Sequence, residues 1–254
     1  MKNSSIFVIL IGICICFIAL KFVIFNQKEE GFIGHFHMQT VCSDGFDTYE
    51  DYIREALKLK LNFITLADHR LCKEYAIKCK EEKRILCVVS EMISTPKGYI
   101  IAFDINQPII KEHYYEGSVN ESIRTGDINL IVNISLKEAV ERIHTAGGIA
   151  IADRNIFLRN KIEDLKGIKF DAILCAPGPN STNTVEYYER LAKELGVPCV
   201  YSQIVHRASQ MEFLLSSCNA TDLFTLKTAI KESKCKPYVP FFAKIKKFLT
   251  QEVL

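Results

Sequence analysis

Hydrophobic residues run without interruption from Ile6 to Leu20 near the start of the chain, and the run resumes after Lys21 as residues 22–25. About 20 residues at roughly 1.5 Å each would cross the hydrocarbon core of a bilayer, with Lys21 near enough to one end to reach the interface. The residues after the run lack the small-residue pattern of a signal-peptide cleavage site. We therefore expect a transmembrane anchor over residues 1–25, with an uncleaved signal as the alternative.

After a short polar linker, residues 26–30, short apolar runs alternate with amphipathic segments. The apolar runs have the length and composition of buried strands, whereas the segments between them have a helical period. Capping-box patterns at residues 47–50 and 135–138 mark the starts of two helices. The predicted strands are the segment that contains His35 and His37, followed by residues 63–67, 85–89, 98–103, 149–152, 170–175 and 198–202. The predicted helices cover residues 47–60, 73–83, 135–147, 183–195 and 222–232.

Seven strands mostly separated by helices predict a parallel α/β barrel-like domain over residues 31–240, followed by a basic tail at residues 241–254. Residues 104–133 interrupt this alternation, because they have no clear period and are longer than an ordinary connection. The segment leaves from a strand near Glu91. We expect it to lie over the carboxyl-end face of the barrel, where it would shape access to a site.

Composition and charge place few limits on the function of the protein. The chain is 48% hydrophobic and 24% charged, which is typical of a globular domain, and its net charge of +2 gives no electrostatic case for nucleic-acid binding. Lys2 and the terminal amine precede the predicted anchor, whereas Lys21 and Lys28 follow it. This balance leaves the orientation open. Our expectation is a single-pass membrane protein whose domain lies outside the cytoplasm.

Ten cysteines are present, two of them inside the predicted anchor, and the other eight contain no C-x-x-C pair. This spacing excludes a zinc ribbon. Cys87, Cys175 and Cys199 fall in apolar runs that predict strands, where a free cysteine packs as a small hydrophobic residue. Disulfides remain open if the domain is exported, but the sequence does not pair them.

Four side chains that can bind metal are concentrated between Gly31 and Arg70. His35 and His37 are two residues apart in a predicted strand, so their imidazoles project on the same side. Asp44 lies in the loop that follows, and His69 follows the next strand directly. In parallel α/β folds the carboxyl ends of strands are where sites are built, so these residues predict a metal site rather than a packed core.

The combination of His35-x-His37, Ser43-Asp44-Gly45 and Asp68-His69 resembles the PHP superfamily (polymerase and histidinol phosphatase domains), whose usual pattern is HxH, SDG and DH. The similarity extends from about residue 34 to residue 237. It implies a distorted (β/α)7 barrel, in agreement with the element pattern, and a metal-dependent phosphoesterase activity. It also implies that His144, which matches a helix preceding a later motif, is not a ligand.

The resemblance adds Glu91, at the position of a glutamate that bridges metals, and His206, at the position of the last histidine. One metal would then keep His35, His37 and Glu91 as ligands. Another would keep a second set, which consists of Asp44, His69 and His206.

Three positions depart from the family pattern. Tyr99 and Asp153 stand where the family has the two histidines of a middle metal, and the aspartate of the last motif is missing. A carboxylate can replace an imidazole as a ligand, so Asp153 remains a candidate, whereas a protonated phenol is a poorer one. The resemblance thus implies one or two divalent ions, zinc, manganese or iron, rather than the three usual in the family.

Arg70, Arg154 and Arg207 each follow a motif position directly, and an arginine fork suits a phosphate. They are the predicted substrate-binding residues, although each could equally be an ordinary residue at the rim. Two functions stay open: a membrane-anchored phosphoesterase that acts on a phosphorylated small molecule or nucleotide, and a catalytically degenerate domain that serves as a membrane-tethered binding or scaffolding module. No protein partner is evident.

Overall fold

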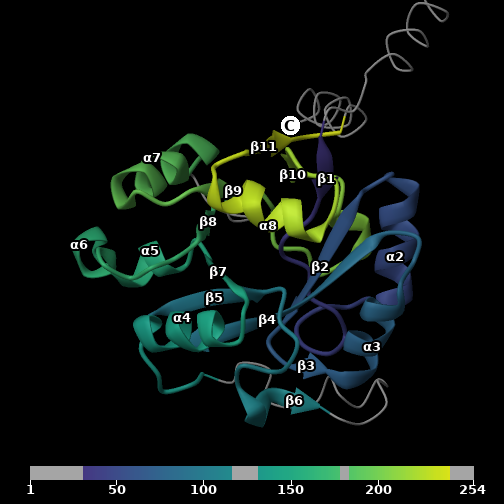
Figure 1. Ribbon diagram of the computed structural model, residues 1–254, viewed down its shortest axis with the longest axis horizontal. Coiled ribbons are helices and arrows are strands. Elements are labelled where there is room, and N and C mark those ends of the chain that lie inside the picture. Colours follow the sequence, from purple (N-terminus) through teal and green to yellow (C-terminus); the bar gives the residue numbers. More distant parts are fainter. Residues whose placement is uncertain (1–30, 116–130, 178–182, 241–254) are drawn as a thin grey trace, which may run out of the picture. The chain divides into compact units, whose positions relative to one another are not determined.

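A computed structural model describes residues 31–115, 131–177 and 183–240, all of which belong to one compact unit, Gly31–Ala243 (Figure 1). The predicted anchor, linker and basic tail lie outside these residues. No helix in the described part of the chain is both long enough and apolar enough to cross a membrane.

The unit is built on a nine-stranded sheet with the order β11-β10-β1-β2-β4-β5-β7-β8-β9. Its strands are β1 (Phe32–Gly34), β2 (Phe63–Asp68), β4 (Leu86–Thr95), β5 (Gly98–Phe103), β7 (Ile149–Ala152), β8 (Ala172–Leu174), β9 (Cys199–Val200), β10 (Leu215–Cys218) and β11 (Cys235–Tyr238). Two further short strands, β3 (Leu71–Cys72) and β6 (Tyr114–Tyr115), pair with each other in parallel.

The sheet is mixed rather than wholly parallel. Strands β1, β2 and β4 run parallel to one another, as do β7, β8 and β9. Strand β5 is antiparallel to both of its neighbours, because only a short turn joins it to β4. The antiparallel pair β10 and β11 is not predicted by the sequence pattern, since Ser216 and Ser217 interrupt its apolar residues. The expectation of a parallel barrel is correct for the repeated strands and wrong for these three.

The two ends of the sheet meet, so that the barrel is nearly closed. Ser216 of β10 accepts a hydrogen bond from the Tyr201 amide at 2.8 Å and donates one to the Tyr201 carbonyl at 2.9 Å. The Gln203 amide also donates to the Leu214 carbonyl at 3.3 Å. These bonds join the chain just after β9 to β10 and its preceding residue, in place of a regular ladder.

Helices cover the outer face of the sheet: α2 (Tyr49–Lys58), α3 (Lys73–Glu81), α4 (Leu136–Thr145), the short α5 (Ile156–Arg159) and α6 (Ile162–Leu165), and α7 (Val185–Leu195). The capping box of α2 forms one residue later than predicted, between Thr48 and Asp51. Ser135 caps α4 as expected, since it accepts a hydrogen bond from the Glu138 amide at 3.1 Å.

One end of the barrel is closed by α8 (Leu223–Lys231). Leu226, Ala229 and Ile230 of this helix pack with the inward-facing side chains of the strands. Lys227 donates to Asp104 at 2.6 Å and to the Gly147 carbonyl at 3.2 Å. Asp104 follows antiparallel β5 and Gly147 precedes β7, so α8 lies at the amino-end face of the parallel strands. The carboxyl-end face is the opposite one.

The segment after β5 begins at the amino-end face because β5 is antiparallel. Ile105 then bonds to Val89 of β4 on the outside of the sheet, and β6 reaches β3 directly after His69. The later described residues of the segment reach the carboxyl-end face as expected, where the Val132 amide donates to the Ser94 carbonyl at 2.8 Å. Residues 116–130 of this segment lie outside the described residues.

All eight cysteines in the described part of the chain are paired. The disulfides are Cys42–Cys72, Cys79–Cys87, Cys175–Cys199 and Cys218–Cys235. Cys87, Cys175 and Cys199 thus form disulfides, the alternative that the sequence left open, rather than packing as free thiols. Cys87 and Cys175 are buried in the sheet.

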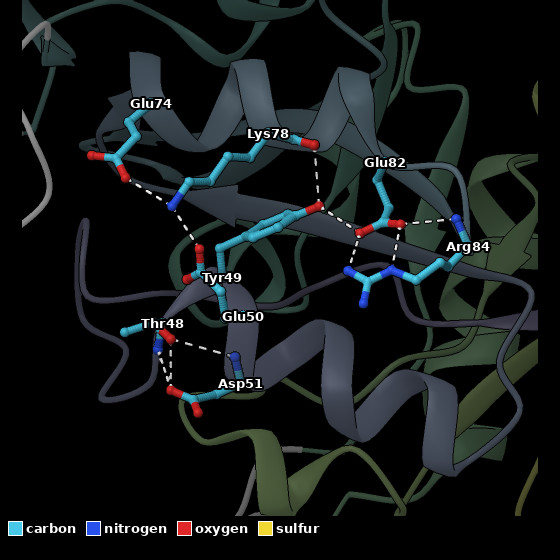
Figure 2. Close-up of polar contacts among 8 residues, drawn as sticks. All are labelled: Thr48, Tyr49, Glu50, Asp51, Glu74, Lys78, Glu82 and Arg84. Atoms are coloured by element: carbon cyan, nitrogen blue, oxygen red, sulfur yellow. Dashed lines mark hydrogen bonds and ion pairs between the residues drawn. The ribbon is translucent and has the colours of Figure 1, made fainter.

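A polar network joins α2 to α3 (Figure 2). The Tyr49 hydroxyl lies 3.1 Å from both the Lys78 carbonyl and Glu82 Oε2. Arg84 donates to both oxygens of Glu82, at 2.9 and 2.7 Å, and Lys78 Nζ donates to Glu50 at 2.6 Å. Every polar group at the centre of this network has a partner, and it anchors the two helices to each other.

Candidate functional site

The predicted ligands, except Glu91, gather at the carboxyl ends of the strands. His35 and His37 follow β1, Asp153 follows β7, and His69 follows β2. His37 Nδ1 lies 3.5 Å from Asp153 Oδ2, without hydrogen-bond geometry. A second contact brings His69 Nε2 to 3.7 Å from Asp44 Oδ2.

Electrostatic interactions place His37 in the middle of this group. Burial, and to a smaller extent the neighbouring His37, lowers the pKa of His35 to about 3. The pKa of His206 is lowered by burial first, then by His37 and Arg154. Burial raises the pKa of Asp44, an effect that His37 opposes. His35 and His206 are therefore neutral near pH 7, which is the form of imidazole that binds metals.

Several buried polar atoms in this group have no hydrogen-bond partner. They are His35 Nε2, both ring nitrogens of His37, Asp44 Oδ1 and Asp153 Oδ2. A buried polar atom without a partner costs about 1–3 kcal/mol, so five of them in one place require an explanation. Imidazole nitrogens and carboxylate oxygens are the donor set of zinc and manganese, and a divalent ion would use these free atoms.

By type, these side chains fit a divalent metal. As they stand, however, no three His, Cys, Asp or Glu side chains among the described residues converge closely enough to hold one ion. Binding would need side-chain rotations that bring the free nitrogens and oxygens together. The site residues are present, but the geometry of a preformed centre is not.

Ser202 fixes the orientation of His35, a role that sequence reasoning missed. Its hydroxyl accepts from the Phe36 amide at 3.1 Å, donates to the Gln203 carbonyl at 3.3 Å, and is hydrogen-bonded to His35 Nδ1. One hydroxyl has a single hydrogen to donate, so when Ser202 gives it to the Gln203 carbonyl, Nδ1 of His35 carries the proton. Nε2 is then left with a free lone pair that faces the site.

Ser94 has the matching position beside His69, because its hydroxyl lies 2.8 Å from His69 Nδ1. The Nε2 atom of His69 is thereby directed to Asp44. Hydrogen bonds of this kind on the second ring nitrogen commonly orient metal-binding histidines. The sequence signal for both serines is weak, since neither occupies a position that marks it as more than a strand residue.

Asp68 organises the loop that carries Asp44. Its Oδ1 atom accepts from the Thr40 amide at 2.6 Å and from the Ser43 hydroxyl at 2.7 Å, and Oδ2 accepts from the Thr40 hydroxyl at 2.8 Å. Burial raises the pKa of Asp68 to about 6, although these hydrogen bonds oppose the shift. Gly45 is required in the same loop, because a Cβ atom there would lie 1.8 Å from the Gln39 carbonyl oxygen.

Glu91 lies apart from the other predicted ligands, on the outer face of its strand. It is fully buried in β4, where side chains alternate, and its neighbours Val89 and Ile93 pack in the outer core beneath the helices. Its carboxylate accepts hydrogen bonds from the Ile109 amide at 2.7 Å and the Ile110 amide at 3.3 Å. The residue therefore holds the segment after β5 against the outside of the barrel.

The three predicted arginines have different environments. Arg207 is exposed, with its guanidinium 4.2 Å from the centre of the Phe46 ring. Arg70 is half-buried directly after β2. Arg154 is buried, and its Nη1 atom has no hydrogen-bond partner. The three thus differ in what they could contribute to a site.

Two further aromatic and imidazole side chains were assigned no ligand role or a poor one. Tyr99 packs edge-on against His69, with ring centres 5.6 Å apart, so it supports that imidazole rather than a metal. His144 lies on α4 and is paired with Asp171 at 2.8 Å, as expected for a non-ligating residue.

Comparisons by sequence find no relative: no protein-family pattern and no curated protein matches the chain. Solved structures do match. A protein from Bifidobacterium adolescentis described as a metal-dependent phosphoesterase has a TM-score of 0.54 and 16% identity, covering 78% of this chain and 95% of that chain.

Two larger proteins share the fold over part of their length. A two-domain protein from Bacteroides vulgatus with a PHP-like metal-dependent phosphoesterase domain has a TM-score of 0.52 and 12% identity, covering 82% of this chain and 65% of that one. Endonuclease Q, bound to duplex DNA with an abasic lesion, has a TM-score of 0.58 and 10% identity, covering 79% and 56%. This chain therefore has the fold of PHP-like phosphoesterases, and it spans about two thirds or less of these two proteins.

Proposed function

We propose that this chain is a metal-dependent phosphoesterase of PHP type with an altered metal site. The observation that carries the proposal is the group of five buried, unpaired nitrogen and oxygen atoms at the carboxyl ends of the strands. His35, His37 and Asp153 would hold one ion. Asp44, His69 and His206 would hold the other, so that one or two ions of zinc, manganese or iron are bound.

A bound divalent ion would supply hydroxide near neutral pH and stabilise the charge that develops on a phosphoryl oxygen. Neighbouring side chains hold the predicted ligands in position for a metal ion. Ser202 keeps the Nε2 lone pair of His35 directed into the site, and Asp68 holds the loop on which Asp44 lies. Burial keeps His35 neutral, so that no proton has to leave before it binds.

The test is hydrolysis of a generic phosphomonoester and a generic phosphodiester, before and after treatment with a chelator. We expect activity that the chelator abolishes and that zinc, manganese or iron restores. Variant His144→Ala is the matched control, because His144 is paired with Asp171 away from the site. Metal-loaded protein that hydrolyses neither ester class would contradict the proposal.

A second function is favoured by the absence of three converging ligands among the described residues and by the outward position of Glu91. In this reading the domain has lost turnover and is a binding or scaffolding module. It predicts that no divalent metal is retained after loading and that no ester is hydrolysed.

The compartment proposed for the domain is an oxidising one, outside the cytoplasm. The four disulfides in the described residues support this, since such bonds persist in oxidising compartments and are rare in the cytosol. The expected anchor over residues 1–25 would then tether the domain to the membrane. Fractionation of cells, followed by peptide mapping without reduction, tests both statements, and a soluble full-length protein with free thiols would contradict them.

A further inference from the structure

Arg154 is the least compensated charge at the site. Only 7% of its surface is exposed, and the Nη1 atom has no hydrogen-bond partner. Among the described residues, no carboxylate lies within ion-pair distance of its guanidinium, although Asp153 precedes it directly. Asp153 instead uses Oδ1 to accept from the Asn155 amide at 2.9 Å and turns Oδ2 to His37.

A buried guanidinium without a hydrogen-bond or ion-pair partner is unfavourable unless a ligand binds to it. Buried guanidinium groups are normally paired, since an isolated buried charge is among the costliest features of a folded protein. The group that would complete Arg154 is an anion. The position at the end of β7, beside Asp153, places that anion at the metal-ligand group rather than on the surface.

The neighbouring side chains agree with an anion at this point. Asp153, which precedes Arg154 directly, lies 3.5 Å from His37, so the guanidinium is next to the predicted metal ligands. Arg70 and Arg207 differ, because they are more exposed and Arg207 stacks on Phe46. Neither of these two has a buried nitrogen without a partner.

We propose that Arg154 forms an oxyanion subsite that holds the phosphoryl group of substrate and product without the help of a bound metal. The inference rests on the proposed function and names its substrate class. A guanidinium offers two parallel N–H donors that match two oxygens of a phosphoryl group. Arg154 thus supplies positive charge next to Asp153, which stands where the PHP pattern has a metal-binding histidine.

The experiment measures binding of inorganic phosphate to the purified, chelator-treated protein by titration calorimetry. Wild-type protein should bind phosphate, and Arg154→Met should bind it at least tenfold more weakly. Arg154→Lys should fall between them, because it keeps the charge and loses the fork. Arg142→Met is the matched control and should stay within twofold of wild type, because Arg142 lies on α4, where it pairs with Glu138 at 2.7 Å. Acetate, with a single planar carboxylate, should bind more weakly than phosphate.

Thermal unfolding of the same proteins separates a binding role from a structural one. Without phosphate, Arg154→Met should unfold at a higher temperature than wild type, because an unpaired buried charge has been removed. Phosphate should raise the midpoint of wild type but not that of Arg154→Met. A variant that melts below wild type, or that fails to fold, would show that the guanidinium holds the fold together and would overturn the proposal.

Equal phosphate affinity of wild type and Arg154→Met would also overturn it, as would a chelator-treated wild type that binds no phosphate. These outcomes are independent of turnover. Loss of hydrolysis with phosphate binding intact would count against the proposed function alone. Metal-dependent hydrolysis without phosphate binding to the metal-free protein would count against this subsite alone.

Discussion

Two polar regions of this domain are built on opposite principles. In the network between α2 and α3, Tyr49, Glu82 and Arg84 satisfy one another (Figure 2). At the carboxyl ends of the strands, His37 and Asp153 are fully buried and keep polar atoms without partners. A network that serves stability is complete in itself, whereas one that is incomplete by itself indicates a ligand.

The two regions also differ in whether their side chains are held in the charged or the uncharged form. Hydrogen bonds from Arg84 lower the pKa of Glu82 to about 2, so the ionised carboxylate is the favoured form there. Burial lowers the pKa of His35 to about 3, so the uncharged imidazole is favoured at the site. The network between α2 and α3 therefore stabilises its own ionised side chains. The strand-end group, which consists of His35, His37, Asp44 and Asp153, instead keeps an uncharged imidazole that can bind a cation.

The largest effect is expected from breaking the strand-end group at its centre with His37→Ala. Metal affinity should fall about 100-fold or more, since even residues that only support a ligand are worth 10–100-fold. The stability of the metal-free protein should fall only by the lost packing of the buried imidazole, because both His37 nitrogens lack hydrogen-bond partners there. Calorimetric titration with zinc and urea unfolding measure the two quantities, with His144→Ala as the control. Unchanged zinc affinity would remove His37 from the site.

A second test uses Glu91, a buried carboxylate that has hydrogen-bond partners but belongs to neither region. Burial raises its pKa to about 7, although the Ile109 and Ile110 amides oppose the shift. Its folded pKa lies above the unfolded value of 4.5, so its contribution to stability is complete below pH 4.5 and is lost as the pH rises through 7. This loss should amount to about 3 kcal/mol.

Variant Glu91→Gln cannot ionise, so its stability should vary less than that of wild type between pH 4.5 and pH 7. Urea unfolding at several pH values measures the difference in slope. The variant should bind zinc as wild type does, since the Glu91 side chain lies on the outer face of β4. Parallel pH profiles for the two proteins would contradict the assignment of this carboxylate.

The smallest effect is expected from the helix network. Tyr49→Phe removes the hydroxyl between the Lys78 carbonyl and Glu82, and it should destabilise the fold by about 1 kcal/mol. Zinc and phosphate binding should not change. Tyr187→Phe is the matched control, because the Tyr187 ring packs against Tyr188 and its hydroxyl makes no hydrogen bond to the described residues. Equal urea midpoints for both variants would show that the network contributes nothing.

The sequence predicts the repeated strands and most helices well, because periodic apolar residues and caps such as Ser135 are local signals. Glu91 is a case in which these local signals do not predict the position of a side chain. The sequence pattern predicts that the strand ends at Val89, which would leave Glu91 in a loop at the site, but β4 continues to Thr95. Inside a strand, alternation decides the face, and Glu91 falls on the outer one.

Long-range pairings are the other part that the sequence does not determine. Cys42 and Cys72 are 30 residues apart and pair only because the loop after β1 lies against β3. Ser202 reaches His35 across 167 positions of the chain, through the nearly closed sheet. The HxH and DH motifs predict which histidines meet, whereas the side chains that orient them depend on the closed fold.

The central claim is that the unpaired atoms at the strand ends form a ligand site, and the metal content of the protein tests it most directly. The purified protein is loaded with zinc, manganese or iron, desalted, and analysed by mass spectrometry of the elements. The account predicts between one and two ions per chain, reduced in both His37→Ala and His69→Ala, and retained in His144→Ala. A wild-type protein that keeps no ion after loading with any of the three metals would contradict it.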